Sequence, residues 1–181
     1  MLLIIIITHP VQYFVPLYQY LTEKGIDLQV WYCSEASAGG GLDPEFGQRV
    51  AWDIPLLEGY RYRIFPNHGL VGKDGSRGLF AYHNPAMLEA LRLQPPSLVW
   101  VSGWSYSTYI AVLRGARRYG HRLLFRAETN LAMEMQRPAW KRWIRKTALR
   151  WLLRDVSHFF YIGQQSLQFY QYLGVPGELL H

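Results

Sequence analysis

Three features are missing from the chain: a second cysteine, a long apolar run and a glycine-rich phosphate-binding motif. Cys33 is the single cysteine among 181 residues, so it can form no internal disulfide, and a reducing cytosol is the simplest setting. The first apolar run, residues 2–7, follows no basic segment and is too short for a signal peptide or a membrane span. Neither G-x-G-x-x-G nor G-x-x-x-x-G-K occurs, and the scattered histidines lack zinc-ligand spacing. We therefore expect no disulfide, no membrane-spanning segment and no metal.

Half of the residues are hydrophobic, and strand-like and helix-like segments alternate along the chain. Apolar or β-branched runs predict strands at 2–7, 27–33, 49–54, 60–65, 98–101, 122–126 and 157–162. Apolar residues at helical spacing predict helices at 11–24, 84–93, 107–119, 138–154 and 164–173. Asn84 and Pro85 fit an N-cap and a first-turn proline. This alternation predicts an α/β fold: one domain, residues 1–181, with a Rossmann-like, doubly wound, mostly parallel sheet and helices on both faces.

Polar and aromatic side chains follow three of the predicted strands. In open α/β sheets, ligands bind beyond the carboxyl ends of the strands, so these side chains are expected to share one crevice. The strand ends supply Thr8, His9 and Gln12; Ser102, Gly103, Trp104 and Tyr106; and Arg126, Glu128, Thr129 and Asn130. Carboxylate and amide groups can bind sugar hydroxyls, an indole can cover a sugar ring, and Glu128 or His9 could act as a base. A loop hydrogen bond for His9, a helix cap or ion pair for Glu128 and a core position for Trp104 stay open as alternatives.

The net charge of +6 comes from one segment. Residues 137–154 contain seven basic residues and no acidic one, and the rest of the chain has a net charge of −1. An apolar stripe at i, i+3 and i+4 spacing accompanies these charges: Trp140, Trp143, Ile144, Ala148, Trp151 and Leu152. Tryptophans beside basic residues are typical of helices in anionic membrane interfaces, so we predict membrane contact by Trp140, Lys141, Arg142, Arg145 and Trp151. The alternative is that the stripe packs on the sheet and the basic residues are only solvated.

Several stretches together resemble the N-terminal, acceptor-side domain of a glycosyltransferase family 4 enzyme with the GT-B fold. They extend over nearly the whole chain, at residues 8–18 (THPVQYFVPLY), 43–47 (DPEFG), 52–60 (WDIPLLEGY), 103–104, 126–130 (RAETN), 161–163, 170 and 173–176. The resemblance implies an acceptor-binding half that faces a donor-binding C-terminal half, expected after residue 181. It departs from many relatives at Thr8-His9-Pro10, where they have a glycine-rich loop, and at Ser102, where they have a histidine.

The resemblance also implies the chemistry. It implies metal-independent, retaining transfer of a hexosyl group from a nucleotide-sugar co-substrate, without another cofactor, to a sugar or lipid-linked acceptor. Such enzymes build polysaccharide or glycolipid in the cytoplasm, often peripherally on the inner face of the plasma membrane. The convergence of the strand ends and the resemblance together predict His9 and Glu128 as catalytic residues, and Gln12, Asp53, Trp104 and Asn130 as substrate-binding residues. The separate half is expected to be inactive, and its uncovered cleft face could self-associate.

Two other functions stay open. The chain could be a freestanding carbohydrate- or nucleotide-binding module, or a membrane-surface interaction domain whose active part is the basic helix. Nucleic-acid binding is not expected, because the basic residues cluster on one helix and no RNA-module signature is present.

Overall fold

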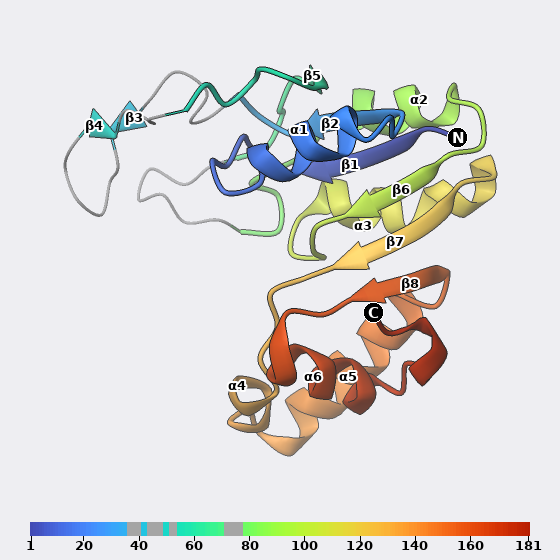
Figure 1. Ribbon diagram of the computed structural model, residues 1–181. Helices are drawn as coiled ribbons and strands as arrows, with labels where there is room; N and C mark the ends of the chain where they lie inside the picture. The colour runs from blue at the N-terminus through green and yellow to red at the C-terminus, as the bar shows by residue number, and fades with distance from the viewer. Residues whose placement is uncertain (36–40, 43–48, 51–53, 71–77) are drawn as a thin grey trace.

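The computed structural model describes residues 1–35, 41–42, 49–50, 54–70 and 78–181. Its centre is a six-stranded sheet in the order β5-β2-β1-β6-β7-β8, and every neighbouring pair of strands is parallel (Figure 1). The strands are β1 (Leu3–Ile7), β2 (Leu28–Tyr32), β5 (Arg61–Ile64), β6 (Leu98–Val101), β7 (Arg122–Arg126) and β8 (Val156–Phe160). Two short strands, β3 (Gly41–Leu42) and β4 (Arg49–Val50), pair antiparallel outside this sheet. The prediction of an α/β fold with a mostly parallel sheet is confirmed.

The chain winds outward from β1 in both directions. From β1 it runs through β2 to β5 on one side, then returns to β6 beside β1 and continues through β7 to β8. The strand order therefore reverses between β1 and β6, and the loops that follow these two strands leave the sheet in different directions. A crevice forms at such a point in doubly wound sheets.

Helices lie on both faces of the sheet. In the described residues they are α1 (Val15–Glu23), α2 (Pro85–Arg92), α3 (Ser107–Gly115), α4 (Leu131–Met135), α5 (Ala139–Leu152) and α6 (Gly163–Leu173), with 3-10 turns η1 (Ala116–Tyr119) and η2 (Gly177–Leu179). The layers follow from the alternation of side chains along β1. Ile4 and Ile6 pack in the core cluster that holds residues of α2, α3, α5 and α6, whereas Ile5 and Ile7 pack in the cluster with α1. All four isoleucines are buried, which is the reason for the uninterrupted apolar run at the start of the chain.

The structure shifts some predicted boundaries for local reasons. The first helix begins at Val15 rather than residue 11, because Pro16 occupies its first turn and the residues before it form a turn. The helix expected over 107–119 is α3 followed by η1, and Gly120 ends it with a left-handed φ of 83°. The short helix α4 was not predicted. Of the strand expected at 49–54, Arg49 and Val50 form β4, and residues 51–53 lie outside the described residues.

Asn84 stands at the expected N-cap of α2, but its side chain does not cap the helix. The amide nitrogen donates to the carbonyl oxygens of Cys33 at 2.8 Å, Pro66 at 2.8 Å and Phe65 at 3.3 Å. The amide oxygen accepts from the Thr108 hydroxyl at 2.9 Å. This buried side chain therefore connects the ends of β2 and β5 to α3.

Candidate functional site

A cavity of about 450 Å³ opens at the carboxyl ends of β1, β6 and β7. Its walls come from the ends of these strands and the segments that follow them: residues 7–9, 11, 13 and 14 at β1, residues 102–106 and 109 after β6, and residues 126–128 at β7. The cavity thus lies at the reversal of strand order, where the topology of the sheet leaves a crevice. Three of the predicted site residues line it, namely His9, Trp104 and Glu128.

His9 is half-buried in the loop after β1, between Thr8 and the buried Pro10. Its Nδ1 shares a hydrogen bond of 3.0 Å with the Thr8 hydroxyl. Tyr109, which belongs to α3, lines the same cavity as Thr8 and His9. Burial raises the pKa of the Tyr109 phenol well above its ordinary value, so this hydroxyl stays protonated. The Thr8 hydroxyl therefore holds the imidazole at the cavity wall.

Glu128 is exposed, whereas its neighbours on both sides are fixed to α6 and to α4. The Ala127 N–H donates to the Tyr170 hydroxyl at 3.1 Å, and the Thr129 hydroxyl donates to Ser166 at 3.2 Å. Asn130 Oδ1 then accepts from the Met133 N–H at 3.3 Å and caps α4. These contacts hold the backbone of the loop and leave the Glu128 carboxylate at the cavity wall.

Two further groups give the cavity its electrostatic character. Burial raises the pKa of Tyr13, the Glu128 carboxylate raises it further, and Arg126 lowers it. Tyr13, Arg126 and Glu128 all line the cavity. The Arg126 guanidinium lies 4.9 Å from the centre of the Phe14 ring. The cavity thus combines a cation, a carboxylate and an imidazole within an aromatic wall.

Trp104 connects the cavity wall to the core. Its ring stacks on Phe125 at 5.8 Å and on Phe169 at 5.9 Å between centroids, and the Arg145 guanidinium lies 5.5 Å from its centre. Gly103 precedes it with a φ of 128°, and a Cβ there would lie 3.4 Å from the Tyr109 ring. The Gly-Trp pair therefore reflects a left-handed backbone that glycine alone adopts readily, followed by a ring held by packing.

The remaining predicted substrate residues lie elsewhere. Gln12 is exposed on the loop after β1, between two residues that line the cavity, but does not line it itself. Asn130 caps α4 and does not line the cavity either. Asp53 lies outside the described residues.

Sequence reasoning missed the phenols of Tyr13 and Tyr109. Tyr13 stands four residues after His9 in the same loop, and Tyr109 stands one helical turn after Tyr106. Both spacings are visible in the sequence and could have identified the two tyrosines as candidate site residues. Arg126 was recognisable from its place at a strand end, but its position on the same cavity as Tyr13 depends on the tertiary fold.

The residues predicted to contact a membrane divide into two groups. Trp140, Trp143 and Trp151 are 62%, 69% and 50% exposed, and Ile144 is exposed beside them, so this stripe does not pack on the sheet. The buried face of α5 is formed instead by Leu149 and Leu152. Of the predicted stripe, Leu152 therefore belongs to the core.

Two of the predicted basic contacts have partners inside the domain. Arg142 donates to the carbonyl oxygens of Met135 at 3.0 Å and Arg137 at 3.4 Å. Arg145 Nε lies 3.1 Å from Oε2 of the buried Glu134 and faces Trp104. These two side chains hold α5 against α4 and the cavity wall. Lys141, by contrast, is exposed with its ammonium 5.3 Å from the Trp140 ring.

Two negative findings concern the described part of the chain. None of its helices is both long and apolar enough to cross a membrane. No group of three or more His, Cys, Asp or Glu side chains in it is placed to hold a metal ion.

A search of curated proteins gave no match to the chain. The model of the glycosyl transferase 4-like domain, however, matches residues 10–181. The match begins directly after His9 and includes the loops after β6 and β7 that form most of the cavity wall. Because it covers far more than half of the sequence, the chain belongs to the glycosyl transferase 4-like domain family.

Proposed function

We propose that this domain is the acceptor-binding half of a retaining GT-B glycosyltransferase, and that the cavity beyond β1, β6 and β7 receives the acceptor. The enzyme would move a hexosyl group from a nucleotide-sugar donor to a sugar or lipid-linked acceptor of polysaccharide or glycolipid synthesis. Membership of the family supports glycosyl transfer in general. The placement of His9 and Glu128 on one solvent-open cavity carries the more specific proposal.

The cavity walls offer the groups that such a reaction needs from the acceptor side. The acceptor oxygen forms a bond to the anomeric carbon of the donor, the bond from that carbon to the diphosphate breaks, and the hydroxyl proton must be accepted. The Glu128 carboxylate is exposed at the cavity wall, which suits it to accept this proton directly or through water. His9, fixed through Thr8, is suited to bind and orient the acceptor hydroxyl.

The other wall residues complete this assignment. Trp104, Tyr106 and Tyr13 supply aromatic edges against which the apolar face of a sugar can pack. Arg126 adds a positive charge beside them, and this charge suits it to contact a donor phosphate when the two substrates meet.

Replacement of Glu128 tests the proposal in the protein expressed from its complete gene. We expect Glu128→Ala and Glu128→Gln to lower kcat by about tenfold or more with an unchanged unfolding midpoint, since a positioned acid or base contributes about 10²–10⁴-fold. Glu89→Gln is the matched control, because Glu89 is an exposed carboxylate on α2 that pairs with Arg92 away from the cavity. Unaltered turnover in both Glu128 variants would remove Glu128 from the reaction. Sugar binding without any turnover in the unmodified protein would favour a freestanding binding module.

A second proposal concerns the exposed stripe of α5, which we define as Trp140, Trp143, Ile144 and Trp151. Exposed tryptophans with Lys141 beside them favour contact with an anionic membrane. We propose the cytoplasmic face of the plasma membrane as the place of this contact. Residues 140 and 151 are separated by about 16 Å along the helix at 1.5 Å per residue, so the stripe can lie flat in a lipid interface. Arg142 and Arg145 have partners within the domain, so this proposal rests on the tryptophans and Lys141 rather than on these two arginines.

A further inference from the structure

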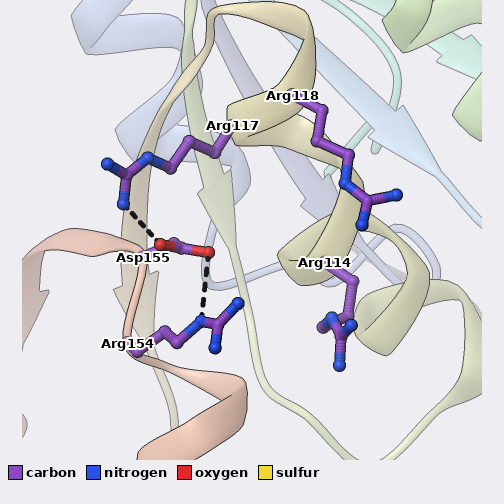
Figure 2. A pocket seen from close by; sticks show the side chains of 5 residues that line it. All are labelled: Arg114, Arg117, Arg118, Arg154 and Asp155. Atoms are coloured by element: carbon purple, nitrogen blue, oxygen red, sulfur yellow. Dashed lines mark hydrogen bonds and ion pairs between the residues drawn. The ribbon is translucent and has the colours of Figure 1, made fainter.

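A second cavity, of about 680 Å³, lies at the opposite edge of the sheet from the first. Arg114, Arg117, Arg118, Arg154 and Asp155 line it (Figure 2). Arg114 comes from the last turn of α3 and the next two arginines from η1, while Arg154 and Asp155 form the turn between α5 and β8. Because β7 and β8 begin beside these segments, the cavity lies at the amino ends of the strands and is separate from the candidate site.

The charges of this cavity are largely uncompensated. Asp155 pairs with Arg117 at 2.5 Å and with Arg154 at 3.7 Å, as Figure 2 shows. One carboxylate therefore faces four guanidinium groups, which leaves a net charge of +3 on the five lining residues. The partial negative charge at the carboxyl-terminal end of α3 and η1 compensates only about half a positive charge more.

Arg118 has no compensating partner in the described part of the chain. It is exposed, and Figure 2 shows its side chain extending beside that of Arg114 rather than toward Asp155. Guanidinium groups present paired N–H donors that match phosphate oxygens, so a cluster of this kind is suited to a phosphate-bearing anion.

Trp151 joins this cavity to the exposed stripe of α5. The Arg114 guanidinium lies 3.6 Å from the centre of the Trp151 ring, and that of Arg154 lies 5.8 Å from it. The same tryptophan is half-exposed at the end of the stripe. The stripe therefore ends at the arginines, so an apolar stripe and a cluster of guanidinium groups adjoin on one surface.

We infer that Arg114, Arg117, Arg118 and Arg154 bind the headgroup phosphate of an anionic phospholipid while the stripe of α5 lies in the lipid interface. This inference rests on the membrane contact proposed above and adds a defined headgroup site to it. A tryptophan stripe alone would favour any lipid surface, whereas the arginine cavity selects lipids that carry net negative charge.

The test measures partitioning of the protein onto vesicles of phosphatidylglycerol and phosphatidylcholine. We expect Arg118→Gln to weaken partitioning about fivefold and Arg114→Gln with Arg118→Gln about twenty-fivefold, on the usual contribution of one basic residue near an anionic surface. The matched control is Arg61→Gln with Arg92→Gln, which removes the same charge from exposed positions, Arg61 being on β5 at the far edge of the sheet. This control should change partitioning less than twofold. Arg118 is exposed and makes no hydrogen bond or ion pair in the described residues, so the Arg118→Gln variant is expected to fold like the unmodified protein.

The outcomes separate this inference from the membrane contact itself. One outcome is that Trp140→Ser with Trp143→Ser abolishes partitioning, while the Arg114/Arg118 variant and the Arg61/Arg92 control weaken it equally. In that case the membrane contact stands and the headgroup site is overturned. If the unmodified protein does not partition onto anionic vesicles, the membrane contact and the headgroup site both fail. If inorganic pyrophosphate binds in an Arg118-dependent way but vesicle binding does not depend on Arg118, the lipid is overturned as the occupant.

Discussion

Replacing Asn84 with alanine is expected to destabilise the domain by about 4–5 kcal/mol. The side chain is 2% exposed and connects β2, β5 and α3. Its two amide hydrogens serve the carbonyl oxygens of Cys33 and Pro66 best, both at 2.8 Å, and its oxygen accepts from Thr108 at 2.9 Å. Three lost bonds cost about 1 kcal/mol each, and carbonyl groups left without a partner in the interior add a further ~1–2 kcal/mol.

Urea unfolding followed by tryptophan fluorescence measures this loss, provided that the slope of the transition is unchanged. Thr108→Val, an isosteric change that removes only the hydroxyl, allows a double-mutant cycle with Asn84→Ala. We expect a coupling energy of about 1 kcal/mol between the two positions. Asn130→Ala is the control, because that side chain makes one exposed bond of 3.3 Å and should cost about 1 kcal/mol or less. A loss below about 1 kcal/mol for Asn84→Ala, or strict additivity with Thr108→Val, would refute the assignment of Asn84 as a buried connector.

Two further predictions concern buried titratable groups. Burial raises the pKa of the Cys33 thiol to about 12. A thiol reagent at about pH 8 should therefore label the native protein far more slowly than the urea-unfolded protein. Equal labelling rates would contradict the burial of Cys33. Burial also raises the pKa of Tyr170 to about 12 and that of Tyr32 above its ordinary value. A phenol whose pKa is raised by folding stabilises the folded state fully below the unfolded pKa of about 10. This stabilisation decreases as the pH rises above that value. The free energy of unfolding should therefore fall between about pH 10 and 12, by up to about 2.7 kcal/mol from Tyr170 alone. The Tyr170→Phe variant should show a smaller decrease over the same pH range. A free energy of unfolding that does not change with pH in the unmodified protein would contradict the prediction.

The positions of the strands and the covering of the sheet on both faces could be predicted from local sequence. A strand that is covered on both faces needs apolar side chains in every position, and residues 2–7 have them, so β1 and its central place followed from composition alone. Gly120 and Gly174 end η1 and α6 with left-handed φ values of 83° and 81°, a conformation that glycine adopts without strain, so these ends were also visible in the sequence. The expectation that the loops after the strands meet at one edge followed from the parallel topology.

Tertiary structure decided which side chains meet. Periodicity shows that α5 has an apolar stripe, but only packing shows that Leu149 and Leu152 are buried while the tryptophans are exposed. From the sequence, Arg145 is expected to be a surface charge. Its pairing with the buried Glu134 depends on α4, a helix too short to be predicted from its sequence pattern. The four arginines of the second cavity come from two segments about 35 residues apart, and their proximity depends on β7 and β8 being neighbours. Local periodicity fixes the direction of a side chain relative to its own helix or strand, whereas the partner it meets depends on how distant segments pack.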